Sequence, residues 1–390
     1  YLEKHLQSSR PPSRFLEKEQ VWKAVFPAEK YDEKQLRYQM SWLLDAFRAW
    51  LTQAELAADE AQSQLYLTHA LRKRGLDDLF EKESKKTAQL IENQPFRDAR
   101  HHYLRYRLQH ENLEKASSQR RGGTLALQPL SDELAVFFAS ETLRQACTAA
   151  SHEATSGHAT DIRSLADVLR QVETDGMLRY PAVAVYFHAY RALLGGLGAT
   201  QNSKPETQNF HFEELKTLVE THWQVFSPAE MRGIYLLAIN FCIRRLNSGD
   251  RAFVREAFEL YRAALGRGLL LENGVLTPFT YKNILRLGLS LGELEWSRRF
   301  LDEQKKFLPA RERENTGRYN LAFFFFQQKN YAEAMPLLQK TDPGDVLNNL
   351  DARRMLLRIY VELGERQALE SLLDAFEIYL RRQKDLGYGR

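Results

Sequence analysis

The chain has 390 residues, of which 44% are hydrophobic and 27% are charged, and its formal net charge is +4. This length and hydrophobic fraction allow two or three compact domains or one elongated repeat stack, and they exclude a chain too polar to build a core. The positive charge is small and dispersed. It does not resemble the clustered basic excess of a dedicated nucleic-acid-binding protein.

The number of cysteines and the length of the apolar stretches indicate in which cellular compartment the protein is expected. Cys147 and Cys242 are far apart in sequence, so they provide neither a disulfide framework nor zinc spacing, and we expect a cytoplasmic protein. No uninterrupted apolar stretch approaches the roughly 18 residues that span a bilayer, so we expect no membrane span. Residues 1–15 are polar and interrupted by Pro11 and Pro12, unlike a signal peptide. A start without Met is compatible with a piece of a longer protein.

Helical patterns follow one another along the chain. From Asp32, a candidate N-cap, apolar residues recur at spacings of three and four and predict an amphipathic helix. Its apolar stripe consists of Leu36, Met40, Leu43, Leu44, Phe47, Trp50 and Leu51. Further helices are predicted near 61–74, 76–93, 95–116, 131–150, 160–174 and 178–196, with loops at 117–124, 151–159 and 195–210. No segment alternates apolar and polar residues as a half-buried strand does, so we expect an all-α protein with essentially no β-sheet.

The C-terminal third shows internal similarity. The segment from Tyr319 to Leu338 resembles a tetratricopeptide repeat: Leu321 and Ala322 match the large–small pair of the first helix, and Ala334 matches the small residue of the second. Equivalent places are taken upstream by Tyr281, Ile284, Gly288, Gly292, Leu301 and Pro309, and downstream by Leu356, Tyr360, Gly364, Leu373 and Phe376.

The spacing of the predicted inter-helix turns supports this resemblance. Gly292, Lys329 and Gly364 follow one another at 37 and 35 residues, close to the roughly 34-residue period of the repeat. A more divergent hairpin is predicted to turn at Gly249. Two short segments, Leu271-Glu-Asn-Gly and Asn349-Leu-Asp-Ala-Arg, also resemble segments of a group of bacterial helical-repeat proteins. This second resemblance implies a fold but no activity.

The resemblance implies a right-handed superhelix of antiparallel helical hairpins, a TPR-like α-solenoid. We divide the chain into an N-terminal helical region (1–125), middle helical hairpins (126–227) and TPR-like repeats (228–390), and expect one continuous solenoid. In such a stack the small residues let paired helices approach closely, and the large ones fill the gaps between successive pairs.

No arrangement of reactive residues indicates catalysis. The glycine-rich run 195–198 follows a predicted helix rather than a strand, so it does not fit a phosphate-binding loop. His101 and His102 point about 100° apart on a helix and cannot chelate one metal together. Cys147 and Cys242 lie in apolar helical runs, where thiols are usually inert. We therefore expect no enzyme, no cofactor and no metal site.

A stack of helical hairpins presents the first helix of each unit along a concave groove. The repeat spacing projects into this groove a set of basic and aromatic residues: Lys282, Arg286, Tyr319, Phe323, Phe326, Arg354 and Arg358, with Leu289 and Val361 beside them. Phe323 and Phe326 are expected to be exposed unless a neighbouring helix covers them. Guanidinium groups bind carboxylates bidentately, so this pattern favours an acidic, partly apolar peptide. Asn283 and Asn320 lie next to the groove positions, which departs from the asparagines of a carboxylate clamp.

These observations predict a non-catalytic scaffold or adaptor that binds a partner protein or acidic peptide. One alternative is a helical-repeat RNA-binding protein, which would need aligned, repeated polar code positions that these irregular repeats do not offer. Another is a regulatory sensor in which a bound peptide controls an attached effector. Basic pairs such as Lys85-Lys86 are interleaved with acids, as on a solvated helix face, so we do not expect nucleic acid to be the partner.

Overall fold

The structure, a computed structural model, describes residues 17–119, 127–156, 160–194, 205–340 and 346–382. Within these ranges it is all-α, with 17 α-helices packed as neighbouring pairs and no strand. The helices are α2 (Lys18–Val25), α3 (Glu33–Ala58), α4 (Glu60–Lys73), α5 (Asp77–Asn93), α6 (Ala99–Gln119), α7 (Gln128–Ser156), α8 (Leu165–Thr174), α9 (Pro181–Leu193), α10 (Pro205–His222), α11 (Pro228–Asn247), α12 (Phe253–Gly266), α13 (Pro278–Ser290), α14 (Leu294–Gln304), α15 (Arg313–Gln327), α16 (Tyr331–Gln339), α17 (Val346–Leu363) and α18 (Arg366–Arg382). The predicted fold class, all-α without a sheet, is confirmed at this level.

The chain forms two compact units. Unit 1 contains residues 1–94 and 101–134, and unit 2 contains residues 95–100 and 135–390. In unit 1, helices α4, α5 and α6 share a small core, made of Ala61, Leu65, Ile91, Leu104 and Leu108. Its polar contacts are buried as well: the hydroxyls of Thr68 and Thr87 lie 3.0 Å apart between α4 and α5.

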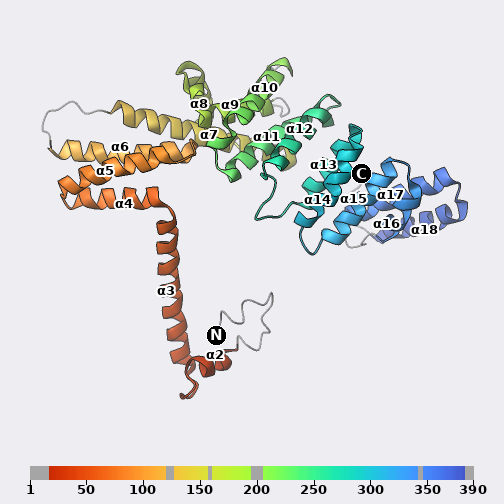
Figure 1. The fold of residues 1–390 in the computed structure, drawn as a ribbon, viewed down its shortest axis with the longest axis horizontal. Coiled ribbons are helices and arrows are strands. Elements are labelled where there is room, and N and C mark those ends of the chain that lie inside the picture. Colours follow the sequence, from red (N-terminus) through yellow and green to blue (C-terminus); the bar gives the residue numbers. More distant parts are fainter. Residues whose placement is uncertain (1–16, 120–126, 157–159, 195–204, 341–345, 383–390) are drawn as a thin grey trace. The chain divides into compact units, whose positions relative to one another are not determined.

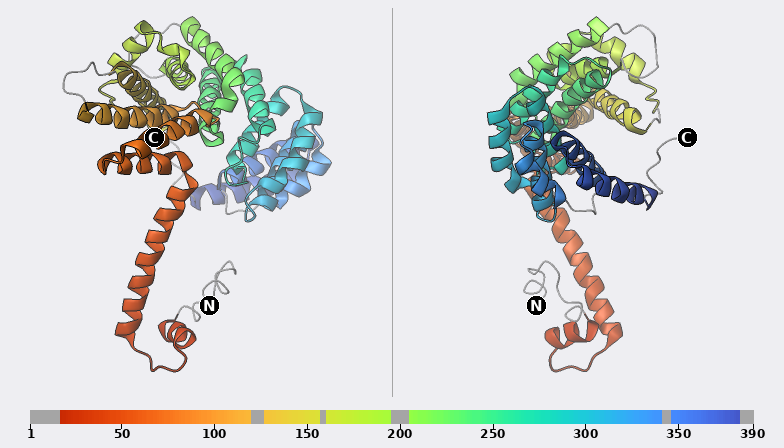
Figure 2. Two further views of the ribbon diagram at one scale, coloured as in Figure 1. Left: turned by 60° about the vertical axis from the view of Figure 1, so that its left-hand side comes forward. Right: turned by 90° about the vertical axis from the view of Figure 1, so that its right-hand side faces the viewer.

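Helix α3 of unit 1 begins as the sequence predicts. The Asp32 side chain accepts hydrogen bonds from the backbone N–H groups of Lys34 (2.8 Å) and Gln35 (3.0 Å), which makes it the N-cap. The helix is 26 residues long. Both views in Figure 2 show it as one unbroken helix. Its apolar stripe is exposed beyond Leu36; Trp50, for example, is 59% exposed.

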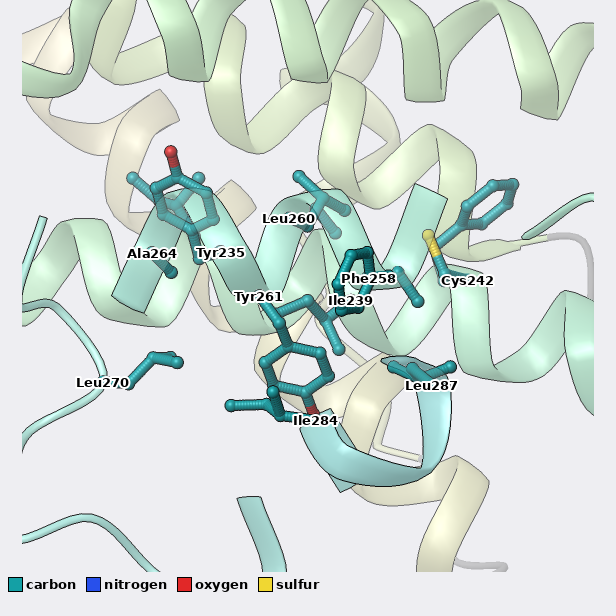
Figure 3. Close-up of a cluster of buried hydrophobic side chains, with 14 of the residues drawn as sticks. Tyr235, Ile239, Cys242, Phe258, Leu260, Tyr261, Ala264, Leu270, Ile284 and Leu287 are labelled. Carbon is teal, nitrogen blue, oxygen red and sulfur yellow. The ribbon is translucent and has the colours of Figure 1, made fainter. Parts of the chain in front are cut away.

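Unit 2 has one continuous hydrophobic core that extends from α7 to α17. Figure 3 shows its centre, where Tyr235 and Ile239 from α11, Phe258 and Tyr261 from α12, and Ile284 from α13 pack together. After α12, helices α13 to α18 are arranged in space in the same order as in the sequence (Figure 1). Helix α13 packs on α14 and on α15, and α15 packs on α16 and on α17. Helices α13, α15 and α17, the first helices of the last three pairs, therefore lie beside one another.

Each of the four predicted turns lies between the two helices of a predicted pair. Gly249, Gly292, Lys329 and Gly364 all adopt the left-handed conformation, with φ between 58° and 96°. At each turn the residue's own N–H and the following N–H bond back to the preceding helix, as in Glu293 N–H to the Gly288 carbonyl and Asn330 N–H to the Phe325 carbonyl. This is the Schellman helix ending. One local device thus closes the first helix of four successive pairs.

Helix ends at three predicted loops differ from the predicted positions. Helix α6 continues to Gln119 and α7 to Ser156, because the Ala-, Ser- and Glu-rich runs before Gly122 and Gly157 contain neither Gly nor Pro to stop a helix. Helix α10 begins at Pro205, a residue that suits the first helical turn. The glycine-rich run 195–198 lies outside the described residues.

Candidate functional site

The predicted groove residues come from three neighbouring first helices of unit 2. Lys282 and Arg286 lie on α13, Tyr319, Phe323 and Phe326 on α15, and Arg354 and Arg358 on α17. The structure brings most of them into one network. Its centre is Asp351, a residue of α17 that the repeat spacing does not project into the groove.

The Asp351 carboxylate is bound by donors from all three helices. Arg286 Nη2 lies 2.7 Å from Asp351 Oδ2, Arg354 Nη2 lies 2.7 Å from Oδ1, and the Tyr319 hydroxyl donates to Oδ2. Burial opposes ionisation of Asp351, but hydrogen bonds from Tyr319 and the nearby Arg286 and Arg354 outweigh it and lower its pKa. The carboxylate therefore stays ionised and holds the three helices in one arrangement.

Cations also cover the aromatic rings of α15. Lys282 Nζ lies 5.1 Å from the centroid of the Tyr319 ring and donates to Asn348 Oδ1 at 2.9 Å. The Arg286 guanidinium lies 5.1 Å from the centroid of the Phe323 ring. Cation–π contacts of this kind stabilise by about 0.5–2 kcal/mol each. We call these residues the Asp351 cluster: Lys282, Arg286, Tyr319, Phe323, Asn348, Asp351 and Arg354.

Of the two alternatives for Phe323, the structure shows the one in which neighbouring helices cover the ring. Phe323 is only 8% exposed and Tyr319 only 1%, because side chains from α13 and α17 cover them. Phe326 is half-buried, and the Arg358 guanidinium lies 5.8 Å from its ring centroid. Arg358 is held in turn by Glu362 at 3.1 Å. The site is thus a charged surface over buried rings, not an open aromatic patch.

The charges of this surface do not cancel. Lys282, Arg286, Arg354 and Arg358 are four cations, and they face two carboxylates, Asp351 and Glu362, which leaves an excess of two positive charges. The side chains of Arg354 and Arg358 are 72% and 66% exposed, so their outer N–H groups are open to solvent. Each of these guanidinium groups is therefore accessible to an anionic group of a partner.

The two asparagines beside the groove positions have structural roles. Asn320 is 1% exposed, and its amide donates to the Thr316 carbonyl within α15. Asn283 makes a side-chain hydrogen bond to Tyr261 of α12. Neither side chain is placed to bind a peptide carboxylate as in a carboxylate clamp.

A second polar feature of unit 2 was not visible in the sequence. A cavity of about 480 Å³ is lined by charged and hydroxyl side chains, including Asp98, Arg100, Glu141, Arg144, Tyr186 and Glu230. The Tyr186 hydroxyl donates to Glu230 Oε1 at 2.9 Å. Burial and the neighbouring Asp98 carboxyl raise the pKa of Glu230 to about 7. We call this the Glu230 pocket.

The sequence signal around Glu230 marks a helix start rather than a site. Ser227-Pro-Ala-Glu230 has the spacing of a capping box, and Ser227 Oγ accepts a hydrogen bond from the Glu230 N–H at 3.3 Å. The contacts of Glu230 with Tyr186 and Asp98 arise from segments more than forty residues away in sequence. Only the tertiary structure reveals them.

The remaining reactive side chains are enclosed. Cys147 and Cys242 are fully buried, and burial raises the pKa of both thiols. Over the described ranges, no group of three or more His, Cys, Asp or Glu side chains could hold a metal ion. No helix within them is long and apolar enough to cross a membrane.

Comparison with known proteins adds no relative. No protein-family model matches the chain, and neither a curated protein nor a solved structure matches it. The tetratricopeptide resemblance therefore depends on the residues and turns described above.

Proposed function

We propose that the face formed by α13, α15 and α17 binds an acidic peptide or an acidic segment of a partner protein, and that the chain acts as a non-catalytic scaffold or adaptor. We further propose that the pairs α11–α12, α13–α14, α15–α16 and α17–α18 are TPR-like hairpins of a right-handed superhelix. Four equivalent Schellman endings and the 37- and 35-residue spacings of the last three support the repeat.

The observation that carries the binding proposal is the unbalanced charge of this face. Four cations surround two carboxylates, and Arg354 and Arg358 keep most of their side-chain surface in solvent. Arg is well suited to bidentate carboxylate recognition because its donors form a rigid fork. Because Asp351 already anchors Arg286 and Arg354, these groups are held in place before a partner arrives, which reduces the entropy cost of binding.

A selection from a random peptide display library on the immobilised full-length chain tests the proposal. We expect enrichment of peptides with two or more Asp or Glu residues, and loss of that enrichment when Arg354 and Arg358 are both replaced by Glu. Selected peptides without acidic residues, or unchanged enrichment with the charge-reversed protein, would contradict the binding face. Circular dichroism of the variant controls for folding, since both side chains are exposed.

An RNA-binding function receives less support from this face. Single-stranded RNA is usually held by stacking bases on exposed aromatic or Arg planes. Here Tyr319 and Phe323 are buried and their faces are covered by Lys282 and Arg286. A bulk single-stranded RNA that competes with the selected acidic peptide, with a steep salt dependence, would favour this alternative.

The Glu230 pocket favours a second candidate, the binding of a small polar molecule. Its volume of about 480 Å³ lies within the range of ligand sites, and a carboxyl with a raised pKa in such a cavity is typical of functional sites. A thermal-shift screen of small polar metabolites, run on the wild type and on Glu230→Gln, tests this candidate. A ligand that stabilises the wild type and loses this effect in Glu230→Gln supports it, and a screen without such a ligand argues against it.

A further inference from the structure

The spacing of the apolar residues of α3 is that of a helix that pairs with another helix along its length. Leu36, Met40, Leu43, Phe47 and Trp50 follow one another in alternating steps of four and three residues. Such steps place the side chains at the a and d positions of a heptad, which form the contact line of a coiled coil. Leu44 and Leu51 follow at e positions and widen the stripe. We call these seven residues the α3 seam.

Among the described residues of unit 1, α2 lies near the first seam residue, Leu36, which is buried. Beyond the other end of the seam, Ala54 at the next a position is half-buried near α4. Between these ends the seam is exposed: Met40 is 54%, Leu43 53% and Trp50 59% exposed. The rings of Phe47 and Trp50 stack on each other with centroids 5.8 Å apart. A contiguous apolar surface of this kind on a soluble helix marks an interaction site.

The charge pattern identifies the occupant. The positions that flank the seam are Gln39, Ala46 and Gln53 on one side and Arg37, Leu44 and Leu51 on the other. Arg37 alone among them is charged, and it pairs with Glu33 of its own helix at 2.9 Å. The charged residues Asp45 and Arg48 lie outside the seam and pair with each other at 3.2 Å. Two identical helices can therefore meet along the seam without repulsion between like charges, which a self-complementary, two-fold interface requires.

A lipid surface fits α3 less well. Helices that lie on membranes carry an excess of Lys and Arg on the polar face. Helix α3 contains three basic residues, Lys34, Arg37 and Arg48, and three acidic ones, Glu33, Asp45 and Glu55. This balance gives no attraction to anionic lipid.

The available surface is large enough for a dimer. The helix has 26 residues and is therefore about 39 Å long. Covering the half-exposed seam residues in two copies, two of them aromatic in each, removes on the order of 1,000 Å² from water. This area reaches the lower limit of specific protein–protein interfaces.

We propose that α3 is a self-association helix whose seam packs against the seam of α3 from a second copy of this chain. The interface is centred on Met40, Leu43, Phe47 and Trp50, which become buried in the dimer. It lies on unit 1 and does not depend on the peptide-binding face proposed for unit 2.

Light scattering coupled to size-exclusion chromatography, and sedimentation equilibrium over a concentration series, test this proposal on the full chain. We expect a species of twice the 45.4 kDa of one chain. Phe47→Glu places a charge in the seam and should raise the dimer dissociation constant at least about tenfold. Tyr38→Glu is the matched control: Tyr38 is 66% exposed and lies nine residues, two and a half turns, before Phe47, on the opposite side of α3.

The proposal is overturned if the wild type is monomeric over the whole series, if Phe47→Glu dimerises like the wild type, or if Tyr38→Glu weakens the dimer as much as Phe47→Glu does. A wild type that stays monomeric but co-sediments with vesicles of anionic phospholipid, dependent on Phe47, would assign the seam to membrane binding instead. Circular dichroism is expected to be the same for all three proteins, because both substituted side chains are exposed.

Discussion

Arg286 on α13 lies 2.7 Å from the carboxylate of Asp351, a residue 65 positions later on α17. Tyr319 of α15 donates to the same oxygen. Three consecutive helix pairs, α13–α14, α15–α16 and α17–α18, are therefore joined through one carboxylate. The Asp351 cluster both stabilises this region and positions Arg354, one of the two cations proposed to bind a partner.

The first prediction concerns this carboxylate. Asp351→Ala should lower the free energy of unfolding by about 1–3 kcal/mol, because it leaves the Tyr319 hydroxyl and the Arg286 guanidinium without their shared acceptor. Urea unfolding followed by circular dichroism measures the loss. Asp302→Ala is the control: Asp302 pairs with Arg298 at 3.2 Å on an exposed surface, and its loss should cost less than about 1 kcal/mol. Equal effects of the two substitutions would contradict the stabilising role of the cluster.

The second prediction concerns the contact of α13 with α14. A Cβ atom on Gly288 would lie 2.6 Å from Ser297 Oγ and 3.2 Å from a ring carbon of Phe258. Gly288→Val should therefore destabilise the protein by about 1–3 kcal/mol through overpacking. Gly233, also inside a helix, has no atom within 4 Å of a Cβ, so Gly233→Ala should be neutral or stabilising by up to about 1 kcal/mol. Thermal unfolding of the two variants compares them, and a stable Gly288→Val protein would contradict the close helix contact.

The third prediction is a loss of stability in mild acid. Nδ1 of His188 and Nδ1 of His211 lie 3.0 Å apart between α9 and α10, and burial lowers the pKa of each ring to about 4. An unfolded His titrates near 6.5. The unfolded chain therefore binds more protons between pH 6.5 and 4, so the stability present above pH 6.5 is lost as the pH falls through this range.

The size of this effect can be measured by urea unfolding at pH 7.5 and pH 5. His188 should contribute on the order of 2 kcal/mol to the difference, and the more solvated His211 less. Replacing both residues by Gln should flatten the dependence over this range. An unchanged slope in the double variant would show that other groups cause it.

The fourth prediction is a loss of stability as the pH rises, opposite to the effect of the two histidines. The pKa of Glu230 is raised to about 7 in the folded chain, above the value near 4.5 of an ordinary Glu, so the folded state binds the extra proton. Its contribution to stability is fully present below about pH 4.5 and is lost as the pH rises through 7. The stability of the wild type relative to Glu230→Gln should therefore fall between pH 5 and pH 8, by up to about 3 kcal/mol. A constant difference would mean that Glu230 has an ordinary pKa.

Local patterns in the sequence were sufficient to predict most of the helices and the turns between paired helices. The N-cap Asp32 and the turns at Gly249, Gly292, Lys329 and Gly364 were predicted because capping and left-handed endings depend on a few adjacent residues. The predicted helix ends were wrong where no residue type stops a helix, as in α7, which continues into the loop predicted at 151–159 as far as Ser156.

The candidate site could be predicted only in part. Repeat spacing placed Lys282, Arg286 and Tyr319 on neighbouring first helices, and they lie together in the structure. The sequence left the burial of Phe323 open and did not indicate the central position of Asp351, because both depend on partners on other helices. Four consecutive Phe residues surround a helix, so sequence alone cannot say which ring a neighbour covers.

The central claim is that the first-helix face of unit 2 binds acidic peptides through Arg354 and Arg358. Fluorescence anisotropy with an acidic peptide from the display selection tests it most directly, on the full chain and on two charge-reversed variants. Arg358→Glu should weaken binding at least about tenfold. Arg381→Glu should leave it unchanged: Arg381 pairs with Glu377 at the same helical spacing, on α18 and outside the Asp351 cluster. Equal affinity of Arg358→Glu and the wild type, or equal loss in both variants, would contradict the claim.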